Sequence, residues 1–154
     1  MSIVNEIEHL YSVLDTEYSK KEFNARKNGH TVAENSWKQK KSLNEQAYFL
    51  FLFTRLEGHV REESAKLITK KQSNLIGWKK QAVWNIFPSR ADKDGITFLN
   101  RVSLLIDKGQ NDYTKINAYY KLRNDLGHGG NMNIPINMID VFDDMKRFFK
   151  TLKA

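Results

Sequence analysis

The sequence contains no cysteine, and only two of its 154 residues are proline. Without cysteine the chain has no disulfide, thiol nucleophile or zinc–thiolate site, which suits a reducing compartment. The scarcity of proline favours long helices over many short strands. The longest strongly apolar run, Tyr48 to Phe53, is far shorter than the ~20 residues of a membrane span. The N-terminus has no basic leader before an apolar core, so we expect a cytoplasmic protein with no membrane partner.

What the chain does contain is ordinary for a folded protein. Hydrophobic residues make up 40% and charged residues 28% of it, which argues against disorder. The length matches one domain, and the absence of any linker or repeat predicts a single domain over residues 1–154. The net charge of +7 favours a polyanion such as RNA as partner, although a merely soluble basic surface has the same charge.

Apolar residues recur at helical spacing through almost the whole chain. The pattern predicts an all-α bundle of about five or six helices with a long central second helix. That helix would begin near Ser36, as its cap, and its apolar segment 47–53 would be buried on every side. Asp112 would cap the fifth helix, and Pro88 would end the third. The expected helices are Ile3–Phe23, Ser36–Lys71, Ser73–Phe87, Gly95–Ile106, Tyr113–Leu126 and Ile136–Leu152. Tyr119 and Tyr120 are expected on the inner face of the fifth helix. The third segment carries the apolar residues Trp78, Val83 and Ile86, and the amphipathic pattern of the last helix runs through Ile139.

An arginine and a histidine lie near the end of the expected fifth helix, in the segment Arg123-Asn-Asp-Leu-Gly-His128. Imidazole exchanges protons near neutral pH, and guanidinium stays charged and matches the oxygens of a phosphate. If Gly127 ends the helix, His128 can turn back toward Arg123, with Asn124 and Asp125 available to orient the ring or the substrate. Such a group suits metal-independent cleavage of RNA. The same residues also fit an arginine at the negative end of a helix dipole and a surface histidine.

The segment from Arg123 to His128 resembles the R-x(4–6)-H motif of the HEPN superfamily, in which the first intervening residue is usually polar, as Asn124 is. The resemblance implies an all-α bundle and a metal-independent endoribonuclease in which Arg123 and His128 are catalytic and no cofactor takes part. It also implies a role in toxin–antitoxin growth arrest or antiviral defence, and hence a cognate antitoxin or defence-system partner. The alternatives are a catalytically silent HEPN-like module that binds RNA or a protein, and a helical interaction protein without nucleic acid.

The second helix carries further candidates in the segment 53–61, which is similar to the long-helix segment of several HEPN groups. Glu57 matches an acid that often lies near the motif, and a helix-surface ion pair explains it equally well. His59 is either a second titrating group or a partly buried packing residue. Arg55 and Lys121 are candidates for binding RNA.

At one position this sequence differs from the pattern of a HEPN subgroup. In HEPN toxins paired with nucleotidyltransferase antitoxins, a tyrosine stands two residues after the motif histidine and is modified with AMP. Here that position is Gly130, so this mode of neutralisation is not implied. His9 and His30 show no metal-ligand spacing, and no phosphate-cradling loop occurs, so we expect neither a metal nor a nucleotide cofactor.

We also expect the active species to be a symmetric homodimer. Cleavage without metal needs one group that accepts a proton and another that donates one, and each chain has only one motif histidine. A two-fold interface at the end of the fifth helix, with Tyr119 or Tyr120 among its candidates, would bring two motifs into one cleft.

Overall fold

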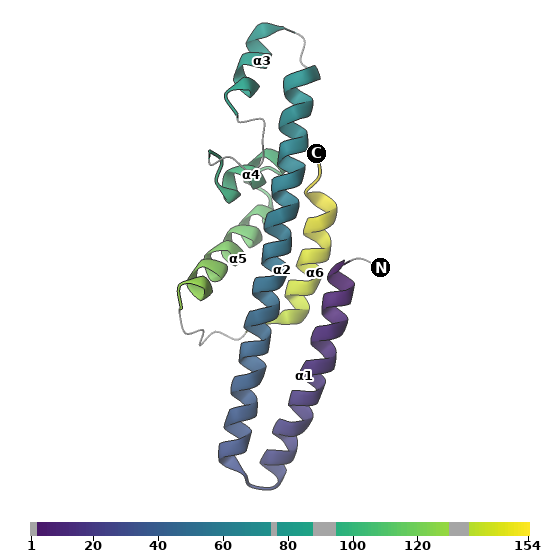
Figure 1. Cartoon of the computed structure of the whole chain (residues 1–154), viewed down its shortest axis with the longest axis vertical. Coiled ribbons are helices and arrows are strands. Elements are labelled where there is room, and N and C mark those ends of the chain that lie inside the picture. Colours follow the sequence, from purple (N-terminus) through teal and green to yellow (C-terminus); the bar gives the residue numbers. More distant parts are fainter. Residues whose placement is uncertain (1–2, 75–76, 88–94, 130–135) are drawn as a thin grey trace. The chain divides into compact units, whose positions relative to one another are not determined.

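The computed structural model describes residues 3–74, 77–87, 95–129 and 136–154, and every regular element within them is an α-helix (Figure 1). The expected all-α class with a long second helix is confirmed. The expected helix end at Pro88 and the position of Gly130 lie outside the described residues. The helices are α1 (Ile3–Lys27), α2 (Thr31–Asn74), α3 (Trp78–Asn85), α4 (Phe98–Leu105), α5 (Asn111–Gly127) and α6 (Met138–Thr151).

The chain forms two compact units that share helices instead of following one another. Unit 1 comprises Met1–Phe53 and Arg123–Lys146, and unit 2 comprises Thr54–Leu122 and Arg147–Ala154. Helices α2, α5 and α6 therefore each contribute residues to both units. The expectation of a single domain over residues 1–154 stays a prediction.

Unit 1 contains a helical hairpin in which α1 lies beside the first part of α2 (Figure 1). Gly29 has a φ of +69°, the left-handed conformation that costs glycine little. The N–H groups of Gly29 and His30 donate to carbonyls of the last turn of α1, at 3.1 and 2.9 Å, and close that helix as a Schellman motif. The carbonyl of His30 accepts from the N–H of Glu34 at 2.9 Å, so α2 begins at Thr31. The expected start and cap at Ser36 are wrong, because the hydrogen bonds of the helix begin directly after the turn.

The core of unit 1 draws on α1, α2 and α6. The ring of Tyr11 contacts those of Tyr48 and Phe142, each with 5.5 Å between ring centroids. The apolar segment 47–53 of α2 is buried on one side only, because Phe51 is 45% exposed. Burial on every side was expected and is wrong. The fully buried residues of this segment are Phe49, Leu52 and Phe53.

The core of unit 2 draws on α2, α4, α5 and α6. Helix α4 is capped by Thr97, whose side chain accepts from the N–H of Asn100 at 3.4 Å. Asp112 is not a cap, because α5 begins at Asn111 and the carboxylate of Asp112 accepts from Nε of Arg147 at 2.8 Å. The most deeply buried apolar residues are Leu56, Val60, Ile68, Val102, Ile116, Phe148 and Leu152.

Helix α3 is held at its C-terminal end more than along its face. The side-chain amide of Gln72 in α2 donates to the carbonyls of Trp84 and Phe87, at 3.0 and 3.1 Å, and so joins the end of α3 to α2. Three apolar residues of α3 and its end, and one residue in the apolar pattern of α6, are exposed instead of packed. The exposed fraction of these four residues is 60–78%; they are Trp78, Val83, Ile86 and Ile139.

Candidate active site

Gly127 is the last residue of helix α5. The N–H of His128 donates to the carbonyl of Asn124 at 3.0 Å, which is the α-helical spacing, and the N–H of Gly129 donates to that of Leu126 at 3.2 Å. Gly129 has a φ of +77°, so the chain leaves the helix there and His128 is the C-cap residue. The helix ends at Gly127 as expected, but the expectation that the chain turns away there and frees His128 is wrong, because the positive φ lies at Gly129.

This cap determines where the two predicted catalytic side chains leave the helix. Positions five apart on an α-helix lie about 140° apart around its axis. The hydrogen bond to Asn124 holds the backbone of His128 close to its helical position, so His128 and Arg123 project from different sides of α5. Within the described parts of the chain, no hydrogen bond joins the His128 ring to another side chain. Within one chain, Arg123 and His128 therefore lie on successive turns of α5, and no hydrogen bond joins their side chains.

Asn124 connects the two predicted catalytic residues. Its side-chain Oδ1 accepts from Nη1 of Arg123 at 3.1 Å, and its backbone carbonyl accepts from the N–H of His128. Arg123 and Asn124 are partly buried, whereas Asp125 and His128 are exposed. The expected grouping of Asn124 with Arg123 thus has a direct contact in the structure. Chemically, the end of α5 presents a positioned guanidinium and an imidazole open to solvent.

The remaining predicted site residues belong to unit 2. Arg55 and Lys121 are exposed, and Glu57 is partly buried in α2. The segment from Arg123 to His128 belongs to unit 1. The participation of these three residues in the site stays a prediction.

His59 is engaged inside unit 2. Its Nε2 lies 2.8 Å from the carbonyl oxygen of Leu152, and its ring stacks at 4.8 Å from that of Phe149. A carbonyl only accepts, so Nε2 carries the proton and donates. Of the two interpretations left open by the sequence, these contacts favour a packing residue that holds the end of α6 against α2.

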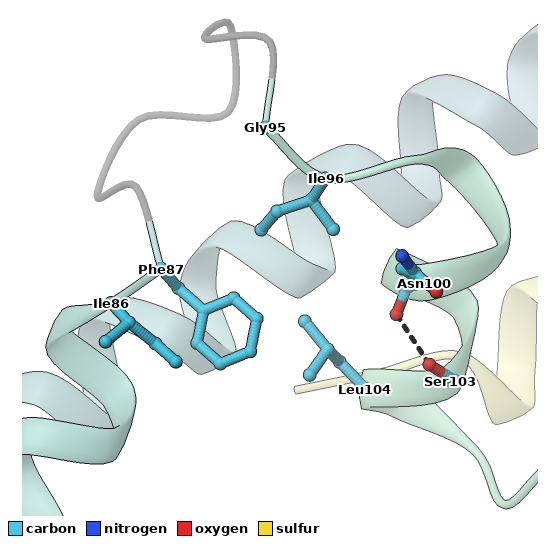
Figure 2. A pocket seen from close by; sticks show the side chains of 7 residues that line it. All are labelled: Ile86, Phe87, Gly95, Ile96, Asn100, Ser103 and Leu104. Atoms are coloured by element: carbon cyan, nitrogen blue, oxygen red, sulfur yellow. Dashed lines mark hydrogen bonds between the residues drawn. The ribbon is translucent and has the colours of Figure 1, made fainter.

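A cavity of about 390 Å³ lies in unit 2, between the end of α3 and the start of α4 (Figure 2). Figure 2 shows Phe87 and Leu104 projecting toward one another across it. None of its lining residues is titratable, and none is a predicted site residue, so the cavity has no group for acid–base chemistry. Its lining residues are Ile86, Phe87, Gly95, Ile96, Asn100, Ser103 and Leu104.

The structure reveals a group of titratable side chains in unit 1 that has no signature in the sequence. Burial, and then the carboxylates of Asp15 and Glu45, raises the pKa of Tyr11. Burial, and then Asp15, raises the pKa of Glu45, while the ammonium of Lys41 opposes this. Lys41 Nζ lies 4.0 Å from Asp15 Oδ1. The members come from two helices and share no motif, so only the packing of α1 against α2 reveals the group.

A buried cation in unit 2 was also missed. Arg101 is 6% exposed, and its Nη1 donates to Oγ of Ser64 at 3.1 Å. Burial, and then the neighbouring guanidinium of Arg61, lowers the pKa of Arg101. Arginine is rarely buried, and a single Arg in an apolar helix pattern gives no signal of it.

The described residues contain no group of three or more His, Asp or Glu side chains placed to hold a metal ion. None of the helices, over the same residues, is long and apolar enough to cross a membrane. No protein-family model, curated protein or solved structure matches this chain.

Proposed function

We propose that the protein is a metal-independent endoribonuclease of HEPN type, with Arg123 and His128 as its catalytic residues. The observation that carries this proposal is the end of α5, where the exposed imidazole of His128 follows the Arg123–Asn124 contact by one helical turn. The motif, the all-α fold with its long second helix and the positive net charge support it. Asn124 supports Arg123, and Asp125 and Glu57 are further candidates for support.

The chemistry is transfer of the phosphoryl group within the RNA strand. The 2′-oxygen attacks phosphorus while an imidazole accepts its proton, and the bond from phosphorus to the 5′-oxygen breaks. A protonated imidazole then supplies a proton to that leaving oxygen. Arg123 binds the non-bridging oxygens and stabilises the charge that grows on them in the transition state. The products are a 2′,3′-cyclic phosphate and a free 5′-hydroxyl.

The two proton transfers favour a homodimer as the active species. Each chain has one motif histidine, and His128 and Arg123 leave α5 on different sides, so a second chain can supply the complementary group. Tyr119 and Tyr120 contribute less to such an interface than expected, because both are partly buried and pack within unit 2. The Tyr119 ring lies 6.3 Å from that of Phe148, and Tyr120 stacks on Phe98 at 5.2 Å. The interface we propose uses the exposed end of α5.

The biological setting of the proposal is antiviral defence or toxin–antitoxin growth arrest in the cytoplasm, with a cognate antitoxin or defence-system partner. The HEPN resemblance supports this setting. A catalytically silent module that binds RNA or a protein is the alternative. A silent module would have no need of an intact Arg–His pair with an exposed imidazole.

Cleavage of RNA in excess EDTA tests the proposal. The wild type should cut total RNA or tRNA and leave 2′,3′-cyclic phosphate ends, and His128→Ala should cut at least ~100-fold more slowly, because general acid–base catalysis contributes that much. His9→Ala, an exposed histidine of α1, is the matched control and should cut at the wild-type rate. His128 is exposed, so its variant should melt like the wild type. A strict requirement for Mg²⁺, or equal activity of the two variants, would overturn the mechanism.

A further inference from the structure

The tip of the α1–α2 hairpin is strongly basic. Residues 20–41 hold seven lysines and arginines against two glutamates, a net charge of +5 in a chain whose total is +7. Both glutamates are already engaged, because Glu22 lies 2.6 Å from Arg26 and Glu34 lies 2.8 Å from Lys38. Of the other lysines, Lys21 pairs with Glu17 at 3.3 Å, and the partly buried Lys41 lies 3.7 Å from Glu22. Within the described residues, the exposed lysines of the tip that form no ion pair are Lys20, Lys27 and Lys40.

Two of these lysines bracket an exposed aromatic ring. Lys20, Phe23 and Lys27 stand at positions i, i+3 and i+7, so they share one side of α1. Phe23 is 61% exposed, and both lysines are exposed. No carboxylate of the described residues forms an ion pair with Lys20 or Lys27. The ring and the two ammonium groups are thus all presented to solvent together.

A second pair of lysines on the hairpin is held by Trp37. The Nζ atoms of Lys21 in α1 and Lys40 in α2 lie 4.9 and 3.9 Å from the centroid of its ring, and the ring itself packs at 5.8 Å from Tyr18. Lys21 also forms an ion pair with Glu17 at 3.3 Å, whereas Lys40 forms no ion pair within the described residues. Trp37 thus holds the ammonium group of Lys40 in place on α2, where it can bind an anion.

We infer that the hairpin tip, residues 20–41, binds single-stranded RNA, with its lysines on the phosphates and the ring of Phe23 stacked on a base. A basic surface with an exposed aromatic ring is the combination that single-strand binding requires. The choice of RNA as partner rests on the proposed function. A helix that lies on a membrane needs a continuous apolar face. The large apolar side chains exposed within the tip are Phe23 and Val32, and lysines flank the ring on its own face.

Binding of a short fluorescein-labelled RNA of mixed sequence, measured by anisotropy over a range of salt concentrations, tests this inference. The full chain carries His128→Ala throughout, so that RNA stays intact. Replacing Lys20 and Lys27 with Gln should reduce the slope of log affinity against log salt by about 1.4, since each lysine on a single strand contributes about 0.7. Phe23→Ala should weaken binding about tenfold through lost stacking. The matched control replaces the exposed Lys108 and Lys150 with Gln, which changes the net charge equally.

The control pair should leave both slope and affinity close to those of the parent protein. Equal losses in the two lysine pairs would show an effect of net charge alone and would overturn the inference, as would unchanged binding in the hairpin variants. Retention of the protein on phosphatidylserine vesicles through Lys20, Phe23 and Lys27, without RNA binding, would also overturn it. Cleavage by the wild type is measured separately. If the wild type cuts no RNA and the hairpin variants still lose RNA binding, the result supports the binding surface. It then contradicts only the proposed nuclease activity.

Discussion

Glu45 is an acid that the α1–α2 packing places beside a second carboxylate. Burial and Asp15 both disfavour its charged form, and they hold its pKa above the usual value of 4.5. Between the usual value and the raised one, the folded protein binds more protons than the unfolded chain. Stability therefore falls as the pH rises through this window, and it stays lower above it.

Glu45→Gln should remove this penalty while keeping the shape of the side chain. Near pH 7 the variant should melt higher than the wild type by at most about 2–4 °C, which is about 1 kcal/mol at this chain length. At about pH 4, where the folded protein holds the proton, the two should melt alike. Thermal melting followed by circular dichroism at both pH values measures this. Glu6→Gln, at an exposed position of α1, serves as control and should not reproduce the gain. A lower melting temperature for Glu45→Gln near pH 7 would contradict the argument.

At the scale of the helix, the same substitution should have opposite effects at two glycines. Gly29 takes a left-handed φ in the hairpin turn, whereas Gly58 lies inside α2. An added Cβ would meet no atom within 4 Å at either position, so backbone conformation alone separates them. This makes the two sites a matched pair.

Gly29→Ala should lower the free energy of unfolding by about 1–2 kcal/mol, the cost of a left-handed conformation for a residue with a Cβ. Gly58→Ala should raise it by up to about 1 kcal/mol, because alanine favours a helix interior over glycine. Urea unfolding followed by circular dichroism measures both. Changes of the same sign in the two variants would show that something other than backbone conformation decides the outcome.

Helix existence could be predicted from the sequence, but helix ends and exposed faces could not. The 3.6-residue pattern indicated all six helices because apolar residues recur along one side of each, although α3 leaves Trp78 and Val83 exposed. Ser36 looked like a cap, yet the Schellman turn at Gly29 starts α2 five residues earlier, and such a turn depends on backbone hydrogen bonds that the sequence does not show. Ile139 fits the apolar pattern of α6 and is nevertheless 72% exposed.

The residues of the candidate site come from the sequence, and their role in catalysis stays a prediction. Arg123, Asn124 and His128 were named from their chemistry and from the resemblance of their segment to the HEPN motif, and the structure adds the contact between Arg123 and Asn124. The sequence favoured Gly127 as the point where the chain turns away from the helix. The structure has this turn at Gly129, because the N–H of His128 still bonds to the carbonyl of Asn124, and glycine positions alone do not reveal such a bond.

At the scale of the whole molecule, the proposed dimer can be tested by mixing. Co-expression of two differently tagged copies, one wild type and one His128→Ala, gives heterodimers that keep one functional histidine. These should cut RNA about 100-fold more slowly than the wild-type dimer, because one of the two proton transfers loses its group. Light scattering should give the mass of two chains. A heterodimer of wild type and His9→Ala is the control. Cleavage at the full rate by a monomer would contradict the arrangement.

The sharing of α6 between the two units has a consequence for synthesis. The ribosome releases α6 after every other described helix, and each unit takes part of its core from it, including Phe142 and Met145 in unit 1 and Phe148 in unit 2. Neither unit can complete its core before α6 has left the ribosome. At about 5–20 residues per second, the nascent chain spends several seconds with the apolar side chains of segment 47–53 lacking those partners. The order of emergence thus makes both cores close together, when α6 becomes available, instead of one after the other.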